Sequence, residues 1–87
     1  MLLLMGADDD WTPAAPCRVL AGGNPGRIQA TFYPGAYHDF DASNQPVRER
    51  HGLAFTASNS GVAHAGTNPD ARMDALRRVP AFLDALP

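Results

Sequence analysis

Two residues of this chain, Asp9 and His38, are of the types and in the positions that acid–base catalysis requires. Each follows an apolar run that stops at or near a glycine: Leu2–Met5 before Gly6, and a second run that ends at Tyr33. An imidazole that acts as a general base needs a carboxylate on its other ring nitrogen, because that carboxylate fixes the tautomer and the ring orientation. An aspartate and a histidine in this order predict the second half of a catalytic triad whose first member is a serine or cysteine.

Both residues also have plainer interpretations. Asp9 lies in the acidic run Asp8–Asp10, which would favour the positive end of a helix that follows it. His38 would be a partly exposed loop histidine, and Asp39 beside it is a rival carboxylate that we expect to be solvated. The catalytic interpretation is favoured when the two residues are considered together, because adjacent parallel strands would bring the turns that carry Asp9 and His38 to the same sheet edge. Gly35 would give the second turn a backbone conformation closed to other residues.

The first member of such a triad has no candidate in this chain. It would sit on a sharp strand-to-helix turn with the pattern G-x-S-x-G or its cysteine equivalent. Cys17 falls inside a predicted helix, where the role of a small buried apolar residue is favoured. Ser58–Gly61 contains hydroxyls but follows the histidine and lacks the pattern. The other histidines, His51 and His64, have no evident partners, and the wide spacing of the three histidines without a short ligand motif argues against a zinc site.

The first part of the chain predicts a strand–helix–strand unit. Leu2–Met5 is a continuous apolar run, as in a strand covered on both faces. Thr12 and the proline after it predict a helix over Pro13–Ala21, with Val19–Leu20 pointing inward. A glycine-rich turn ends that helix, and Arg27–Tyr33 then alternates apolar and polar residues with period two. A unit of this size predicts two parallel strands joined by a crossover helix.

The remainder predicts a long loop and one more helix. From Asp41 to about Gly66 the periodicity fades, apart from a short extended piece at Leu53–Phe55. Asn68 and the proline after it open the last helix, which Pro80 should kink or divide because it lacks an N–H. Apolar residues at intervals of three and four predict a buried face. That face comprises Met73, Leu76, Val79, Phe82, Leu83 and Leu86, and the wetter side comprises Asp70, Arg72, Asp74, Arg77 and Arg78.

Composition limits what the chain can be. It has 87 residues, 45% of them hydrophobic, a net charge of −2 and one cysteine. The charge indicates no nucleic-acid partner and no anionic membrane, and no apolar run approaches the ~20 residues of a membrane span. We therefore expect a soluble protein; the single cysteine leaves the compartment, cytoplasm or periplasm, undecided. A core of this size is marginal without help, and a buried-type strand at the very start is typical of a chain that begins in mid-domain.

The chain resembles the C-terminal part of the dienelactone hydrolase family, within the α/β-hydrolase superfamily. The resemblance rests on Leu2–Cys17, with its Gly-x-x-Asp-x-x-Thr-Pro spacing, on Tyr33–Asp41, and on Ala63–Thr67 with the helix after it. It covers essentially all of residues 1–87, which would be less than half of a full family domain. The motif around the histidine is fairly specific, whereas the one around the aspartate is shared across much of the superfamily.

The resemblance implies an α/β fold class and a reaction. The chain would be the C-terminal fragment of an α/β-hydrolase sheet, with two parallel strands, a crossover helix, a long loop and a C-terminal helix. Asp9 would be the triad acid and His38 the triad base in the hydrolysis of a small ester or lactone, without metal or organic cofactor. The nucleophile would be a Cys or Ser in a G-x-[CS]-x-G elbow that lies upstream in chain order, or that a complementary chain supplies. The alternative is a catalytically inactive fragment, or a small module that docks through an exposed sheet edge.

Overall fold

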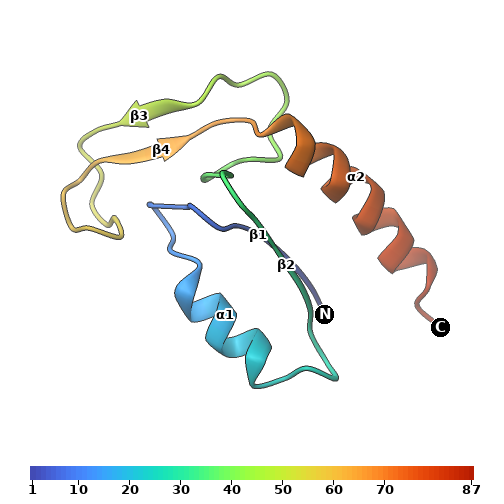
Figure 1. Ribbon diagram of the computed structural model, residues 1–87. Coiled ribbons are helices and arrows are strands. Elements are labelled where there is room, and N and C mark those ends of the chain that lie inside the picture. The colour runs from blue at the N-terminus through green and yellow to red at the C-terminus, as the bar shows by residue number, and fades with distance from the viewer.

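The computed structural model describes residues 1–87 as a small mixed α/β domain (Figure 1). Its elements are β1 (Leu2–Gly6), α1 (Ala15–Gly22), β2 (Gln29–Tyr33), β3 (Arg48–Arg50), β4 (Ala63–Ala65) and α2 (Pro69–Asp84). β1 pairs with β2 and β3 with β4, as two separate two-stranded sheets. In Figure 1 the β1–β2 pair lies between α1 and α2, and β3–β4 lies beyond the end at which β1 and β2 finish. Neither helix has the length and apolar character needed to cross a lipid bilayer.

The predicted parallel strand pair is confirmed. Leu2 lies opposite Gln29 and Gly6 lies opposite Tyr33, so β1 and β2 run in the same direction and finish at one edge. The pairing continues one step past the strands, because the Ala7 N–H donates to the Tyr33 carbonyl at 2.9 Å. The two turns that follow the strands therefore leave the sheet side by side, as a shared site at the strand ends requires.

The helix after β1 starts later than predicted and is poorly covered. α1 begins at Ala15 rather than Pro13. Thr12 does not cap it, because the N-cap position is Ala14, which has no side-chain acceptor. Thr12 belongs to the preceding turn, where its N–H donates to the Asp9 carboxylate. Val19 and Leu20, predicted to point inward, are 77% and 50% exposed. The prediction fails because an apolar pair in a helix is buried only where another element covers it, and nothing in this chain covers that side of α1.

The second strand is shorter than predicted, although its two faces divide as expected. β2 begins at Gln29 rather than Arg27, because the Arg27 N–H donates to the Asn24 carbonyl in a turn. Phe32 lies under the Arg18 guanidinium of α1, whose central carbon is 4.1 Å from the ring centroid. Tyr33, the next residue, points the other way and is buried beside α2. The alternation therefore holds at the end of the strand.

The segment predicted as loop contains a second strand pair. β3 and β4 are antiparallel, with Glu49 opposite His64. The three residues of β3 are charged and exposed, so no hydrophobic alternation marks them as a strand. Their partner β4 supplies the buried residues Ala63 and Ala65. The extended piece predicted at Leu53–Phe55 is wrong, since it belongs to the irregular connection between the two strands.

The last helix starts where the sequence predicts and is not divided. The Asn68 side chain accepts the Ala71 N–H at 3.1 Å, which is the expected N-cap. α2 then continues through Pro80 to Asp84 without interruption. The expected division does not occur because Pro80 and the residue whose carbonyl it leaves free, Leu76, are both exposed, so water can bond that carbonyl.

The core is small and lies between the sheet end and α2. It consists of Tyr33, Ala36, Phe40, Ala71 and Ala75, with Leu4 packed against it. The helix thus buries alanines rather than its predicted face of large residues. Members of that face are between 43% and 69% exposed: Met73, Leu76, Val79 and Leu83. No large side chain in the chain is fully buried.

One residue placed on the wet side of α2 belongs to the core margin instead. Asp74 accepts a hydrogen bond of 2.7 Å from the Tyr33 hydroxyl. It also forms ion pairs with Arg77 and Arg78, three and four residues later in the helix. This bond ties α2 to the end of β2.

Candidate active site

The turn after β1 holds Asp9 in a fixed orientation. One carboxylate oxygen, Oδ1, accepts the N–H groups of Trp11 and Thr12 at 2.9 and 2.8 Å. These bonds form because the chain turns sharply after Gly6, where the Asp9 N–H donates to the Gly6 carbonyl. The side chain is only 7% exposed. The second oxygen, Oδ2, is therefore aimed by the fold rather than free to rotate.

The turn after β2 is shaped by Gly35 and carries His38. Gly35 has a φ of 75°, the left-handed conformation that the sequence predicts for this position. Its N–H donates to the Asp8 carboxylate at 2.5 Å, which ties this turn to the turn after β1. Three residues later, His38 forms an isolated bridge with Ala65 of β4. The turn is thus held on both sides before the imidazole is placed.

The two predicted site residues meet. Nδ1 of His38 lies 3.1 Å from Oδ2 of Asp9. An ionised carboxylate can only accept, so Nδ1 carries the hydrogen and Nε2 of the neutral ring has a free lone pair. This is the tautomer that a general base needs. The meeting of the two side chains at the strand ends is confirmed; their catalytic roles stay predictions.

An open depression lies beside the imidazole. The His38 side chain is 30% exposed, and its ring packs against Trp11 with centroids 4.7 Å apart. The depression has a volume of about 230 Å³. Its apolar lining comes from Leu4, Met5, Tyr37 and Phe40, and its polar lining from Thr12, the carboxylates of Asp39 and Asp41, and the site pair. The space beside the ring is therefore partly apolar, as a pocket for a small organic molecule would be.

The rival carboxylate, Asp39, lies at the other ring nitrogen. Its Oδ1 is 3.6 Å from Nε2 of His38, and its side chain is 64% exposed. Asp39 has a φ of 59°, and its carbonyl accepts the Ala42 N–H. It is the solvated loop residue that the sequence predicts, yet it also stands close enough to stabilise a protonated His38.

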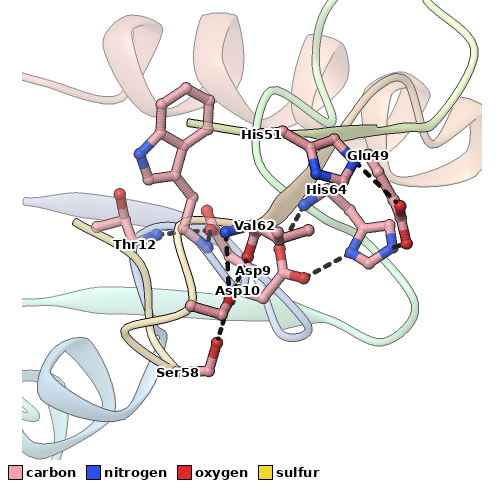
Figure 2. A network of polar contacts seen from close by, with 10 residues as sticks. Asp9, Asp10, Thr12, Glu49, His51, Ser58, Val62 and His64 are labelled. Atoms are coloured by element: carbon pink, nitrogen blue, oxygen red, sulfur yellow. Dashed lines mark hydrogen bonds and ion pairs between the residues drawn. The ribbon is translucent and has the colours of Figure 1, made fainter. Parts of the chain in front are cut away.

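A second histidine–carboxylate pair lies beside the first, and sequence reasoning missed it. Asp10 accepts the His64 N–H at 2.7 Å and faces the ring Nδ1 at 2.5 Å (Figure 2). Glu49 approaches His64 Nε2 at 3.8 Å and His51 Nε2 at 3.3 Å. The prediction that His51 and His64 lack partners is therefore wrong. The only sequence signal was the alternation of Ala63, His64 and Ala65 in an otherwise polar segment.

The acidic run Asp8–Asp10 does not interact with the N-terminus of α1, the helix that follows it. Asp8 bonds the Gly35 turn, Asp9 bonds His38 and Asp10 bonds His64. The first turn of α1 contains no acidic residue. Consecutive side chains in a turn point in different directions, so three aspartates in a row reach three separate segments. The interpretation of this run as a partner of the helix dipole is wrong.

Two carboxyl groups have pKa values below the ordinary range. Burial raises the pKa of Asp10, but the N–H and ring hydrogen bonds from His64 outweigh burial, so the net pKa is lowered. The hydrogen bond from Tyr33, with those from Arg78 and Arg77, lowers the pKa of Asp74. In turn, burial and the bond to Asp74 raise the pKa of Tyr33 to about 12.

No hydroxyl or thiol is bonded to the free ring nitrogen of His38. Ser58 and Ser60 bond each other at 2.8 Å in the exposed connection between β3 and β4. Cys17 lies partly covered in α1. The histidines and carboxylates form pairs, and no group of three or more such side chains is arranged to hold a metal ion.

Comparisons with protein-family models, with curated proteins and with solved structures give no significant match to this chain.

Proposed function

We propose that this chain carries the acid–base half of a hydrolase for small esters or lactones. It would be the C-terminal part of an α/β-hydrolase domain of the dienelactone hydrolase type. The observation that supports it is the bond between His38 Nδ1 and Asp9 Oδ2 at the ends of adjacent parallel strands. Asp9 is itself fixed by two backbone N–H groups, which leaves its second oxygen directed at the imidazole, as the acid member of a triad requires.

In this reaction His38 moves protons and Asp9 stabilises the charge that results. Nε2 takes the proton from a serine or cysteine as its oxygen or sulfur attacks the ester carbonyl, and returns it to the departing alkoxide or enolate. Water then loses a proton to Nε2 as it attacks the acyl group, and the nucleophile leaves with that proton. Asp9 faces the positive imidazolium at both stages, which is the role of the acid member in a triad.

The remaining parts of the site would come from the rest of such a domain, encoded upstream or carried by a complementary chain. They are the nucleophile on its elbow and the backbone amides that bind the developing oxyanion. Two features of the molecule fit such a chain. β1 pairs on one edge only, so its second edge is open to a further strand, and the large apolar residues of α1 and α2 have no cover.

Complementation tests the proposal. The chain is co-expressed with the elbow-bearing N-terminal portion of a dienelactone hydrolase, and hydrolysis of a dienelactone and of p-nitrophenyl acetate is measured. We expect turnover that His38→Ala abolishes and that Asp9→Asn lowers by roughly 10⁴-fold, because the amide favours the wrong tautomer. His51→Ala is the matched control, since His51 is an exposed histidine outside the pair. A complex whose activity ignores His38 would refute the assignment.

Docking without catalysis is the second candidate, and the open edge of β1 is the observation that favours it. An unpaired strand edge is a template for pairing with another chain. A docking module would form the complex equally well with His38→Ala and would show no hydrolysis even with the unaltered chain. The same co-expression therefore separates the two functions.

The region encoded upstream offers a further test of the fragment proposal. It should encode an apolar strand followed by a G-x-[CS]-x-G elbow and then a helix. The isolated chain should also hydrolyse p-nitrophenyl acetate no faster than free imidazole at the same concentration. Faster turnover by the isolated chain would show that the nucleophile lies within it.

A further inference from the structure

β4 contacts both turns of the candidate site through neighbouring residues. The His64 N–H donates to one oxygen of the Asp10 carboxylate, and the His64 ring faces the other oxygen. Asp10 is the residue next to Asp9. The following residue, Ala65, bridges to His38, and the Gly66 N–H donates to the His38 carbonyl at 3.0 Å. β4 thus fixes both the backbone at His38 and the side chain of Asp10.

The His64 ring has contacts with three other segments of the chain. Nδ1 faces Asp10 from the turn after β1, and Nε2 faces Glu49 from β3 (Figure 2). The Tyr37 ring, from the turn after β2, stacks on it with centroids 4.9 Å apart and planes 30° apart. His51 pairs with the same Glu49 carboxylate, at 3.3 Å from its Nε2. A ring between two carboxylates and an aromatic face is well suited to a fixed position.

We propose that His64 is a positioning residue that sets the spacing between Asp9 and His38. The two turns are also joined by the Asp8 carboxylate, which accepts the Gly35 N–H, by the Asp8 N–H, which donates to the Ala36 carbonyl at 3.0 Å, and by the packing of Trp11 on His38. The His64–Asp10 hydrogen bonds add a separate connection, because they fix the aspartate turn to β4, and β4 is fixed to the His38 backbone. Loss of the His64–Asp10 bonds leaves the His38–β4 bonds in place and releases from β4 the side of the aspartate turn next to Asp9. The consequence for catalysis rests on the proposed function, whereas the geometric claim does not.

Nitrogen NMR of the histidine rings in the full chain reports the tautomer of His38, which depends on the bond between its Nδ1 and Asp9. In the unaltered protein His38 should appear as the tautomer with hydrogen on Nδ1. His64→Ala should move most of the population to the other tautomer, because Asp9 no longer stays within bonding distance. His64→Asn should restore the original signal, since its amide nitrogen occupies the place of Nδ1 and can donate to Asp10.

Matched variants separate the possible outcomes. His51→Ala removes an exposed histidine of the same network and should leave the His38 signal unchanged. Asp10→Ala, which removes both oxygens that His64 bonds, should act like His64→Ala, and it decides the matter if His64→Ala loses the native backbone spectrum. A folded His64→Ala or Asp10→Ala protein with an unchanged His38 signal would overturn the proposal. Asp9→Asn tests the pair itself: an unchanged signal there would remove the basis of the proposed function instead.

Discussion

The strand-end rim of this molecule, residues 7–10, 35–39 and 63–66, is built differently from the body formed by β1–β2 and the two helices. In the rim, each aspartate of the acidic run has a partner in another segment, and one connection spans 54 residues of sequence. In the body, large apolar side chains on both helices lie exposed. Directional polar bonds can fix a site within a short chain, whereas burial needs enough chain to cover every apolar face.

The largest effect should come from adding one methyl group at Gly6, the last residue of β1, where the strand contacts the rim. A Cβ at Gly6 would lie 2.6 Å from the Ala36 carbonyl oxygen and 2.8 Å from that of Tyr37. Both are backbone atoms of the histidine turn and cannot move away cheaply. We expect Gly6→Ala to lower the free energy of unfolding by about 1–3 kcal/mol, the usual cost of overpacking, as measured by urea denaturation.

The matched control lies in the body. A Cβ at Gly22, the last residue of α1, meets no atom within 4 Å. Gly22→Ala should therefore be neutral or raise stability by up to about 1 kcal/mol, since alanine favours a helix over glycine. Equal losses from both variants would contradict the contrast between a tight rim and an open body.

The rim pair was predictable because its signal is local. Asp9 and His38 each follow a strand that ends at or near a glycine, and parallel strands bring their ends together. The second pair could not be predicted in this way. His64 lies 54 residues from Asp10, beyond a segment without periodicity, and the strand opposite it contains only charged residues. A polar bond over that distance depends on how the whole chain folds back, which no local pattern encodes.

In the body the same kind of pattern was misleading. Intervals of three and four correctly marked an apolar face on α2, but burial of that face also depends on a neighbour. The buried residues of α2 are Ala71 and Ala75, because small residues let the helix approach Phe40 and Tyr33 closely. Helix amphipathicity predicts which side is apolar and says nothing of what covers it.

The tyrosine at the margin of the body should ionise late. In a Tyr37→Phe background, Tyr33 is the remaining tyrosine, and its absorbance should titrate with a pKa of about 12. Because the folded pKa is raised, this bond stabilises the fold up to the ordinary pKa near 10 wherever Asp74 is ionised, and the stabilisation is lost as the pH rises through 12. Asp74→Asn should bring the titration to lower pH; an unchanged titration would remove Asp74 as a cause.

Acid should weaken the rim and the body through different carboxylates. The pKa values of Asp10 and Asp74 are both lowered in the fold, by His64 in the rim and chiefly by Tyr33 in the body. Each bond therefore stabilises the fold above the ordinary pKa of 3.8 and loses that contribution as the pH falls through the lowered value. Urea midpoints measured from neutral pH downward should fall less steeply for Asp10→Asn and for Asp74→Asn. Equal slopes for the unaltered chain and both variants would contradict these assignments.

The smallest effect should come from charging the open face of the body. Met73 is 69% exposed on α2, so Met73→Lys should change the free energy of unfolding by no more than about 0.5 kcal/mol, as at other surface positions. It should also reduce self-association, measured by sedimentation, because it interrupts an exposed apolar patch. Ala75→Leu, two residues further along the helix but buried against Phe40 and Tyr33, should cost about 1–3 kcal/mol by overpacking. If Met73→Lys were as costly as Ala75→Leu, the apolar face of α2 would already be covered in solution, and the body would be as complete as the rim.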